Sequence, residues 1–343
     1  DKYLFDKYET FASNPLLLTI MLLTFENRVS IPDRRNDFFE AAFTTLFHTH
    51  DATKGGYKRD IRSKLGYEDF KVVFSYFCFK SFFNYDYEFS ENKVLQYIGK
   101  ARQKKITEAN FSSEDYLTDL TNSVCMLIHE GLEYRFSHRA FQEYFAALYT
   151  TQLDDSQQKQ FIKLWLEEND YRTTSDYLDM LYDLQPSRFI KNIISPAIRE
   201  LRELYDENGK SEEWLITYMY GNLFIKMKPD GEKTCSITIQ KFYYCDMVRR
   251  VCDIGGFYKD MSKEKMQQNK LRNEKLINIL ELEYGVNKEI QIDELKKKEN
   301  FSNFLEDMFG IMERYEFAVN YIEAMDKNSF THEKSFSSML EEL

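Results

Sequence analysis

The sequence predicts a mainly α-helical protein, and three observations lead to this fold class. Apolar residues recur at helical spacing along most of the chain. Glycine and proline, which punctuate turn-rich all-β folds, number only 12 and 5 among 343 residues. Hydrophobic residues make up 43% of the chain, enough to bury large cores and to exclude wholesale disorder. At about 100–200 residues per domain, the length allows two or three domains.

A first, helical domain is expected over residues 1–62. Asn14 and Pro15 suit the cap and the first position of a helix, and the apolar run that follows to Leu23 predicts a helix buried on all sides. Pro32 begins a second helix, whose apolar face comprises Phe38, Phe39, Ala42, Phe43, Leu46 and Phe47. A polar connection follows, and its basic cluster is either a solvated loop, which we favour, or a phosphate contact. The cluster consists of Lys54, Lys58, Arg59, Arg62 and Lys64.

A winged-helix domain with a β-hairpin is expected over residues 63–152. Helical stripes at Phe70–Cys78 and Val94–Ala101 come first, and Ser112 and Asp115 resemble a capping box before another helix. An apolar run at residues 124–128 and a tight turn at Glu130-Gly131 then precede a segment of period two, formed by Leu132, Tyr134 and Phe136. Helical spacing resumes at Phe141, Tyr144, Phe145 and Leu148. Several helices followed by a hairpin suit a winged helix.

A C-terminal helical domain with one small hairpin is expected over residues 153–343. The hairpin pairs Leu223–Met227 with Cys235–Ile239, and a helix farther upstream is interrupted by Pro196. Near the end, apolar residues follow a heptad pattern from Phe301 through Ile322, with Gly310 inside it. This stripe is either an oligomerisation seam or, as we favour, a helix packed within its own domain.

Charge and composition exclude several classes of protein. Lys and Arg number 46 against 57 Asp and Glu, so the net charge of −11 opposes a general nucleic-acid binder. The longest apolar run, around Leu16–Phe25, is too short for a membrane span, and no secretory signal is visible. Five cysteines without paired spacing indicate reduced thiols in the cytoplasm. Because the chain begins at Asp1 rather than Met, we expect further residues upstream.

The chain offers no recognisable catalytic or metal site. Asn208–Ser211 looks like the tail of a phosphate-binding loop but lacks the upstream glycine and strand, so a polar turn is favoured. His48 and His50 beside Asp51 do not share a helical face, and no metal is expected. Buried free thiols are the default interpretation of Cys245 and Cys252. The sequence leaves open whether the whole protein is an enzyme.

His138 is the one residue whose position in the sequence suggests a binding role, namely contact with a phosphate. It lies directly after the alternating strand and before a helix, where free backbone N–H groups and partial positive charge gather. An imidazole there can donate to a phosphate. The alternative is a structural cap or core histidine, which spacing alone favours.

Three segments, in this order, resemble NACHT proteins, which belong to the STAND class of signal-transducing ATPases. Residues 14–20 (NPLLLTI) resemble the motif of the helical domain that follows the ATPase core, and residues 31–35 (IPDRR) resemble the link into its second helix. Residues 134–147 (YRFSHRAFQEYFAA) resemble the winged-helix signature, with Ala140 in place of a common serine. The resemblance covers residues 1–152.

This resemblance implies two nucleotide-binding residues. Pro15 corresponds to the proline that lies against the adenine, and His138 to the histidine that reaches the phosphates of ADP in the closed, resting state. The phosphate loop and magnesium-binding carboxylates of the family are absent from this sequence. Either the chain is the C-terminal part of a longer NACHT protein, which we favour, or the protein has lost its ATPase core. ATP or ADP with Mg²⁺ is expected in the longer parent protein, and no cofactor for this chain alone.

The resemblance also predicts function and partners. We expect the regulatory and sensing half of an ATP-driven switch in bacterial antiviral defence, fused to an upstream NACHT ATPase core. A phage-derived or other ligand would trigger it, and activation would assemble a homo-oligomer. No membrane partner is expected. A winged-helix DNA-binding regulator and a nucleotide-independent helical scaffold remain the alternatives. The sequence identifies neither the trigger ligand nor the N-terminal effector domain.

Overall fold

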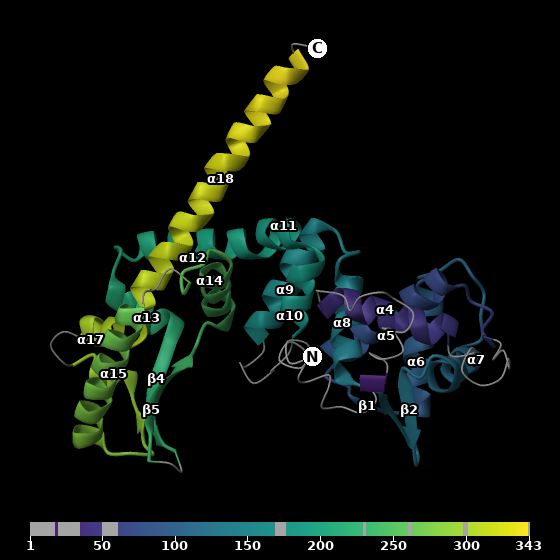
Figure 1. Ribbon diagram of the computed structural model, residues 1–343, viewed down its shortest axis with the longest axis horizontal. Coiled ribbons are helices and arrows are strands. Elements are labelled where there is room, and N and C mark those ends of the chain that lie inside the picture. Colours follow the sequence, from purple (N-terminus) through teal and green to yellow (C-terminus); the bar gives the residue numbers. More distant parts are fainter. Residues whose placement is uncertain are drawn as a thin grey trace. The chain divides into compact units, whose positions relative to one another are not determined.

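The computed structural model describes residues 18–19, 35–49, 61–168, 176–228, 231–259, 263–297 and 301–341. The described part is mainly helical with two small three-stranded antiparallel sheets, which confirms the predicted fold class (Figure 1). The chain divides into two compact units. Unit 1 contains residues up to Asp154 together with Ser175–Ser187, and unit 2 contains Asp155–Thr174 and the chain from Arg188 onward.

Unit 1 combines helices with one short sheet. Its elements are α4 (Arg35–Thr49), α5 (Tyr67–Phe83), β1 (Glu88–Ser90), α6 (Glu91–Gln103), α7 (Ser113–Thr118), a π-helical turn (Asp119–Ser123), β2 (Leu127–Glu130), β3 (Glu133–Phe136), α8 (Arg139–Thr150) and α10 (Tyr177–Leu184). The predicted capping residue Ser112 is confirmed, because its Oγ accepts a hydrogen bond from the N–H of Asp115 at 3.2 Å.

The sheet of unit 1 has the order β1-β3-β2 and is antiparallel throughout. The predicted hairpin is confirmed, and Gly131 in its turn has a φ of 65°, a conformation that glycine adopts without strain. Tyr134 and Phe136 are buried, as their alternation predicts. Leu132 departs from the prediction: it lies in the turn before β3 and is 89% exposed. Strand β1 was not predicted.

Helix α8 forms the centre of the unit 1 core. The ring of Phe145 lies 4.9 Å from that of Phe43 in α4 and 4.8 Å from that of Phe74 in α5. Phe39 of α4 stacks on Tyr144 at 5.2 Å. The apolar face predicted for residues 38–47 therefore packs directly on the helix that follows the hairpin.

Unit 2 is mostly helical with a second sheet. Its elements are α9 (Asp155–Glu168), a π-helical turn (Ile190–Ile194), α12 (Ser195–Glu207), α13 (Glu212–Met219), β4 (Tyr220–Met227), β5 (Lys233–Ile239), α14 (Phe242–Ile254), α15 (Lys263–Tyr284), β6 (Glu289–Ile290), α16 (Ile292–Leu295), α17 (Phe301–Phe309) and α18 (Ile311–Glu341); α11 (Pro186–Phe189) spans the boundary of the two units. The sheet order is β5-β4-β6, so the predicted hairpin of β4 and β5 is confirmed and β6 adds an unpredicted third strand.

Pro196 does not interrupt its helix as predicted, because the helical path continues through it. In an α-helix, the proline ring would collide with the carbonyl group four residues earlier. Here a π-helical turn at Ile190–Ile194 precedes Pro196, which occupies the second position of α12. The wider π turn relieves the collision.

The predicted heptad stripe is divided between two helices rather than lying on one. Gly310, with a φ of 57°, separates α17 from α18. Leu305, Met312, Tyr315 and Ile322 are buried, and α18 packs on α12 and α14 of the same unit. This arrangement supports packing within the unit as the role of the stripe.

Candidate functional site

Of the two predicted nucleotide-binding residues, the structure describes only His138. Pro15 lies outside the described residues, as do His50, Asp51, Lys54, Lys58 and Arg59. His138 lies at the junction of β3 and α8 in unit 1, where the sequence pattern places it.

His138 caps α8. Its backbone is extended, with φ −155° and ψ 137°, and its Nδ1 accepts a hydrogen bond from the N–H of Ala140 at 3.1 Å. This bond satisfies one of the backbone donors that every helix N-terminus leaves free. The strand before it is anchored as well, because the N–H of Ser137 donates to the carbonyl oxygen of Met126 at 2.9 Å. The structural interpretation of His138 as a cap is thus correct for this nitrogen.

The cap also determines which form of the imidazole is present. A nitrogen that accepts a hydrogen bond carries no proton, so the neutral ring holds its proton on Nε2. Burial lowers the pKa of His138 below its ordinary 6.5, which favours this neutral form at pH 7. The half-buried ring therefore keeps one N–H donor, Nε2, beyond its structural role.

A cation lies next to this cap. The guanidinium of Arg139 lies 4.5 Å from the centre of the Tyr87 ring, and its Nε is 3.0 Å from Oε1 of Glu143. The side chain of Arg139 is 43% exposed and that of Glu143 only 7%. Burial raises the pKa of the Glu143 carboxyl group above its ordinary value, and the positive charge of Arg139 offsets only part of this rise. The positive end of α8 thus presents an imidazole N–H and a partly exposed guanidinium, the groups that bind a phosphate.

The other polar residues of the signature segment hold unit 1 together. Nε2 of Gln142, which is fully buried, donates to Oγ of Ser81 and to the carbonyl oxygen of Asp86, both at 2.9 Å. The hydroxyl of Tyr144 donates to Oε2 of Glu40 at 3.2 Å. The sequence pattern does not reveal these roles, since each partner lies more than 50 residues away along the chain.

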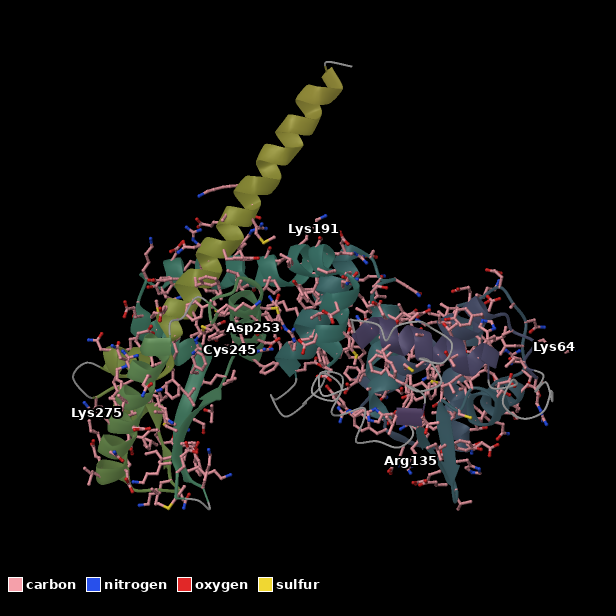
Figure 2. All side chains as sticks on the ribbon, in the orientation of Figure 1. Lys64, Arg135, Lys191, Cys245, Asp253 and Lys275 are labelled. Atoms are coloured by element: carbon pink, nitrogen blue, oxygen red, sulfur yellow. The ribbon has the colours of Figure 1, made fainter. Side chains whose placement is uncertain are left out.

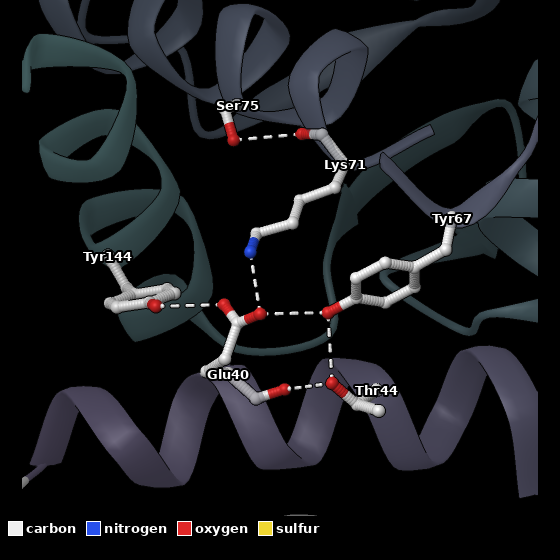
Figure 3. A network of polar contacts seen from close by, with 6 residues as sticks. All are labelled: Glu40, Thr44, Tyr67, Lys71, Ser75 and Tyr144. Carbon is white, nitrogen blue, oxygen red and sulfur yellow. Dashed lines mark hydrogen bonds and ion pairs between the residues drawn. The ribbon is translucent and has the colours of Figure 1, made fainter. Parts of the chain in front are cut away.

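Glu40 is the hub of a network that joins α4, α5 and α8 (Figure 3). Its Oε1 accepts from the hydroxyl of Tyr67 at 2.9 Å and from Nζ of Lys71 at 2.6 Å, while its Oε2 accepts from Tyr144. The hydroxyl of Thr44, one turn along α4, lies 2.9 Å from that of Tyr67 and donates to the carbonyl oxygen of Glu40. One carboxylate therefore connects the helix of the first predicted domain to two helices of the second.

Asp119 fixes the connection that leads into α5. Its carboxylate is fully buried and accepts hydrogen bonds from the N–H groups of Arg62 and Ser63 at 2.9 and 2.8 Å. The sequence offered no signal for this contact, because residue 119 and the connection are far apart along the chain. Arg62 thus contributes its backbone here.

The remaining candidates behave as structural residues. The ring of His48 stacks on Tyr67 at 5.3 Å, and the described residues contain no cluster that could hold a metal ion. Residues 208–211 form a turn in which Oγ of Ser211 caps α13, accepting from the N–H of Trp214. Cys245 and Cys252 are free thiols buried in unit 2. Figure 2 labels Cys245. None of the described helices is both long and apolar enough to cross a membrane.

A cavity of about 740 Å³ lies in unit 2, beside the beginning of β5. The hairpin contributes Gly231, Glu232 and Lys233, and α15 contributes three asparagines, Asn269, Asn273 and Asn278. The amide oxygen of Asn273 is buried and has no hydrogen-bond partner among the described residues. No pattern in the sequence predicted this cavity, since the hairpin and α15 approach each other only in the fold.

Comparison with known proteins bears on the C-terminal half of the chain. Residues 182–343 match the family model of the Short NACHT-associated C-Terminal domain, family 7. No curated protein and no solved structure matches the chain. The family match falls on the region in which the sequence held no motif, so it is independent of the three segments that resemble NACHT proteins. It supports a C-terminal part of a NACHT-associated protein.

Proposed function

We propose that this chain is the regulatory and sensing half of an ATP-driven NACHT switch in bacterial antiviral defence, acting in the cytoplasm. The observation that carries the proposal is the family match of residues 182–343 to a C-terminal domain associated with NACHT proteins. Unit 2 would sense a phage-derived or other trigger. Unit 1 would hold the nucleotide of an upstream NACHT core, and activation would assemble a homo-oligomer.

The order of elements in unit 1 supports a winged helix over residues 63–152. Helix α5, strand β1, helices α6 and α7 and the hairpin β2–β3 follow one another, and β1 joins the hairpin in one sheet. This order is typical of winged-helix domains. The division into domains at 1–62, 63–152 and 153–343 stays a prediction.

His138 would act as the latch of this winged helix. Its Nδ1 is occupied by the α8 cap, so Nε2–H is the group available to donate to a phosphate of ADP. Pro15 would lie against the adenine, while the upstream core would supply the phosphate cradle and Mg²⁺. Because most of the binding energy for a triphosphate comes from that cradle, this chain alone is expected neither to hydrolyse ATP nor to bind ADP tightly.

The acidic character of the relevant surfaces argues against the DNA-binding alternative. Helix α7 would be the recognition helix of a helix-turn-helix pair, but its first turn carries Glu114 and Asp115. The hairpin, which would be the wing, carries Glu130 and Glu133 at its tip. Carboxylates at both positions would repel the phosphate backbone.

The test is the rate at which ADP dissociates from the protein that includes the NACHT core. His138→Asn keeps a side-chain oxygen that can cap α8 in place of Nδ1, but its amide N–H₂ group ends one bond short of the position of Nε2, so the phosphate donor is lost from that position. A hydrogen bond to a charged group is worth about 1.5–3 kcal/mol, so fluorescent ADP should dissociate roughly tenfold to over a hundredfold faster. Loss of the latch should also produce self-activation, visible as larger assemblies without a trigger.

Ser112→Ala is the matched control, because it removes the N-cap of α7 in the same unit. It should lower stability by about 1 kcal/mol and leave ADP dissociation unchanged. An unchanged dissociation rate in His138→Asn would reduce His138 to a structural cap and refute its role as a latch.

A further inference from the structure

Helix α10 belongs to unit 1, although the chain on either side of it belongs to unit 2. Helix α9 lies in unit 2, Ser175–Ser187 with α10 in unit 1, and the chain from Arg188 onward in unit 2 again. Only Gln185 separates α10 from α11, which begins at Pro186. The family match begins at residue 182, inside α10. Helix α10 is therefore joined to unit 2 at both ends while it packs in unit 1.

Buried contacts with three helices hold α10 in unit 1. The ring of Tyr177, which is fully buried, stacks on that of Phe82 in α5 at 5.0 Å. The hydroxyl of Tyr177 lies 2.7 Å from that of Thr150, at the end of α8. In addition, Nδ2 of Asn36 in α4 donates to the carbonyl oxygen of Met180 at 2.9 Å. These contacts fix α10 against the helix that carries the candidate site.

The beginning of α10 also reaches the residues around the His138 cap. The backbone N–H of Asp176, the residue just before α10, donates to the carboxylate of Glu143. The same carboxylate accepts a hydrogen bond from Nε of Arg139 at 3.0 Å, one turn earlier in α8. Glu143 therefore connects α10 to the guanidinium that lies next to the cap.

The hold of Glu143 on Arg139 depends on how far water is kept from this carboxylate. Glu143 is buried, and the helix that carries it packs against α10. An ion pair of residues four apart on an exposed helix face contributes little, because water competes for both charges. Where water is excluded, the same charges attract each other more strongly. Removal of α10 would withdraw the N–H of Asp176 and admit water to Glu143, so the Arg139 guanidinium would lose its fixed position.

We infer that Glu143 is a positioning residue through which α10 controls the candidate phosphate site. While α10 packs on α8, Glu143 holds Arg139 next to the His138 cap, and both side chains donate to a phosphate of ADP. When α10 leaves α8, Arg139 is released and ADP dissociates faster. Because α10 is joined to unit 2 at both ends, a change in unit 2 reaches it along the chain. The inference rests on the sensing role proposed for unit 2 and on the latch role proposed for His138.

The first test uses the 343-residue chain and needs no nucleotide. Nuclear magnetic resonance measures how fast the Nε–H proton of Arg139 exchanges with water in the wild type and in Tyr177→Phe. The variant removes the hydroxyl that meets Thr150 and keeps the ring that stacks on Phe82. Loss of one neutral hydrogen bond should make α10 leave α8 roughly twofold to tenfold more often, and the exchange rate should rise by the same factor.

Tyr116→Phe is the matched control for this measurement. Its buried hydroxyl donates to the carbonyl oxygen of Phe70 at 2.8 Å, in a contact that involves neither α8 nor α10. It removes the same kind of hydrogen bond from the same unit and should leave the exchange rate of Arg139 unchanged.

The second test measures ADP dissociation from the protein that includes the NACHT core. Glu143→Gln keeps an amide oxygen for the N–H of Asp176 but removes the charge that holds Arg139. Fluorescent ADP should dissociate about tenfold faster from Glu143→Gln and roughly twofold to tenfold faster from Tyr177→Phe. In an Arg139→Ala background, neither change should add to the rate, because both act through the guanidinium.

Three results would overturn the inference. They are an Arg139 exchange rate that Tyr177→Phe leaves unchanged, an equal effect of Tyr116→Phe, and ADP dissociation that Glu143→Gln does not accelerate or accelerates equally in Arg139→Ala. A failure of the proposed latch looks different, because His138→Asn would then leave ADP dissociation unchanged. The exchange measurement involves no ADP, so it tests the connection of α10 to Arg139 by itself.

Discussion

The Glu40 network makes a quantitative prediction about unit 1. Glu40→Ala removes the acceptor for Tyr67, Lys71 and Tyr144 at once (Figure 3). The Lys71 side chain is only 17% exposed, so its ammonium group loses its carboxylate in a poorly hydrated place. Hydrogen bonds to charged groups contribute about 1.5–3 kcal/mol each. Because the Glu40 side chain is 34% exposed and water replaces part of the loss, we expect a total of about 3 kcal/mol.

A double-mutant cycle separates one bond of the network from the rest. Tyr144→Phe removes the longest of the three, at 3.2 Å, and should cost about 1 kcal/mol. Since that bond is already absent in Glu40→Ala, the same tyrosine change should cost much less in that background. The difference between the two costs is the coupling energy, expected near 1 kcal/mol.

The chain contains an internal reference for this measurement. Both of its tryptophans, Trp165 and Trp214, lie in unit 2, so tryptophan fluorescence during urea unfolding reports on that unit alone. Hydrogen exchange of α4, α5 and α8 reports on unit 1. Glu40→Ala should accelerate exchange in these helices while the fluorescence midpoint stays where it is.

An exposed ion pair provides the matched control. Glu130 and Arg135 are 2.5 Å apart on the hairpin, with side chains 59% and 49% exposed (Figure 2 labels Arg135). Glu130→Ala should change stability by less than about 0.5 kcal/mol. If Glu40→Ala costs no more than Glu130→Ala, or the coupling energy is zero, the carboxylate does not hold α4 to its neighbours.

Three further changes test the local geometry, and a fourth measurement tests the isolated chain. Gly255→Ala should destabilise unit 2 by about 1–3 kcal/mol, because a Cβ there would lie 2.7 Å from Cε1 of Phe317; the fluorescence midpoint measures this. Gly131→Val should cost unit 1 about 1–3 kcal/mol in its urea unfolding, since a β-branched residue resists a φ of 65°. The pKa of His138 is lower in the folded protein than in the unfolded chain, so the unfolded chain binds a proton more readily. The contribution of His138 to stability should therefore be complete above pH 6.5 and diminish as the pH falls below that value. The difference in unfolding free energy between the wild type and His138→Asn, followed against pH, measures this contribution. Purified chain should release no phosphate from ATP, and calorimetry should detect no micromolar binding of ADP.

The sequence predicted what depends on local periodicity and missed what depends on distant contacts. The change from helical spacing to period two, with Gly131 between the strands, located the hairpin and the cap at His138. Strands β1 and β6 have three and two residues, too few for any period, and exist only because they pair with β3 and β4. The break at Gly310 required its positive φ, which a stripe of apolar residues does not reveal.

In the candidate site as well, the sequence predicted local features and missed contacts between distant residues. His138 could be located from the sequence, but its two nitrogens acquire separate roles only once the Ala140 N–H is seen to occupy Nδ1. Glu40 and Asp119 carry no local signal, since their partners are brought to them by folding. A carboxylate on an otherwise apolar helix face, as at Glu40 beside Phe39 and Phe43, is the one feature that could have indicated a buried partner.

Helix α8 couples the candidate site mechanically to the rest of unit 1. His138 caps its first turn. Farther along the helix, Gln142 binds the carbonyl group of Asp86 just before β1, Tyr144 binds Glu40 of α4, and Phe145 packs on Phe74 of α5. A displacement of the cap therefore moves a packed unit rather than a loop, which is what a two-state switch needs. It follows that loss of activity on substituting residues of this segment does not by itself identify a nucleotide contact. Only a variant such as His138→Asn, which preserves the cap, separates binding from folding.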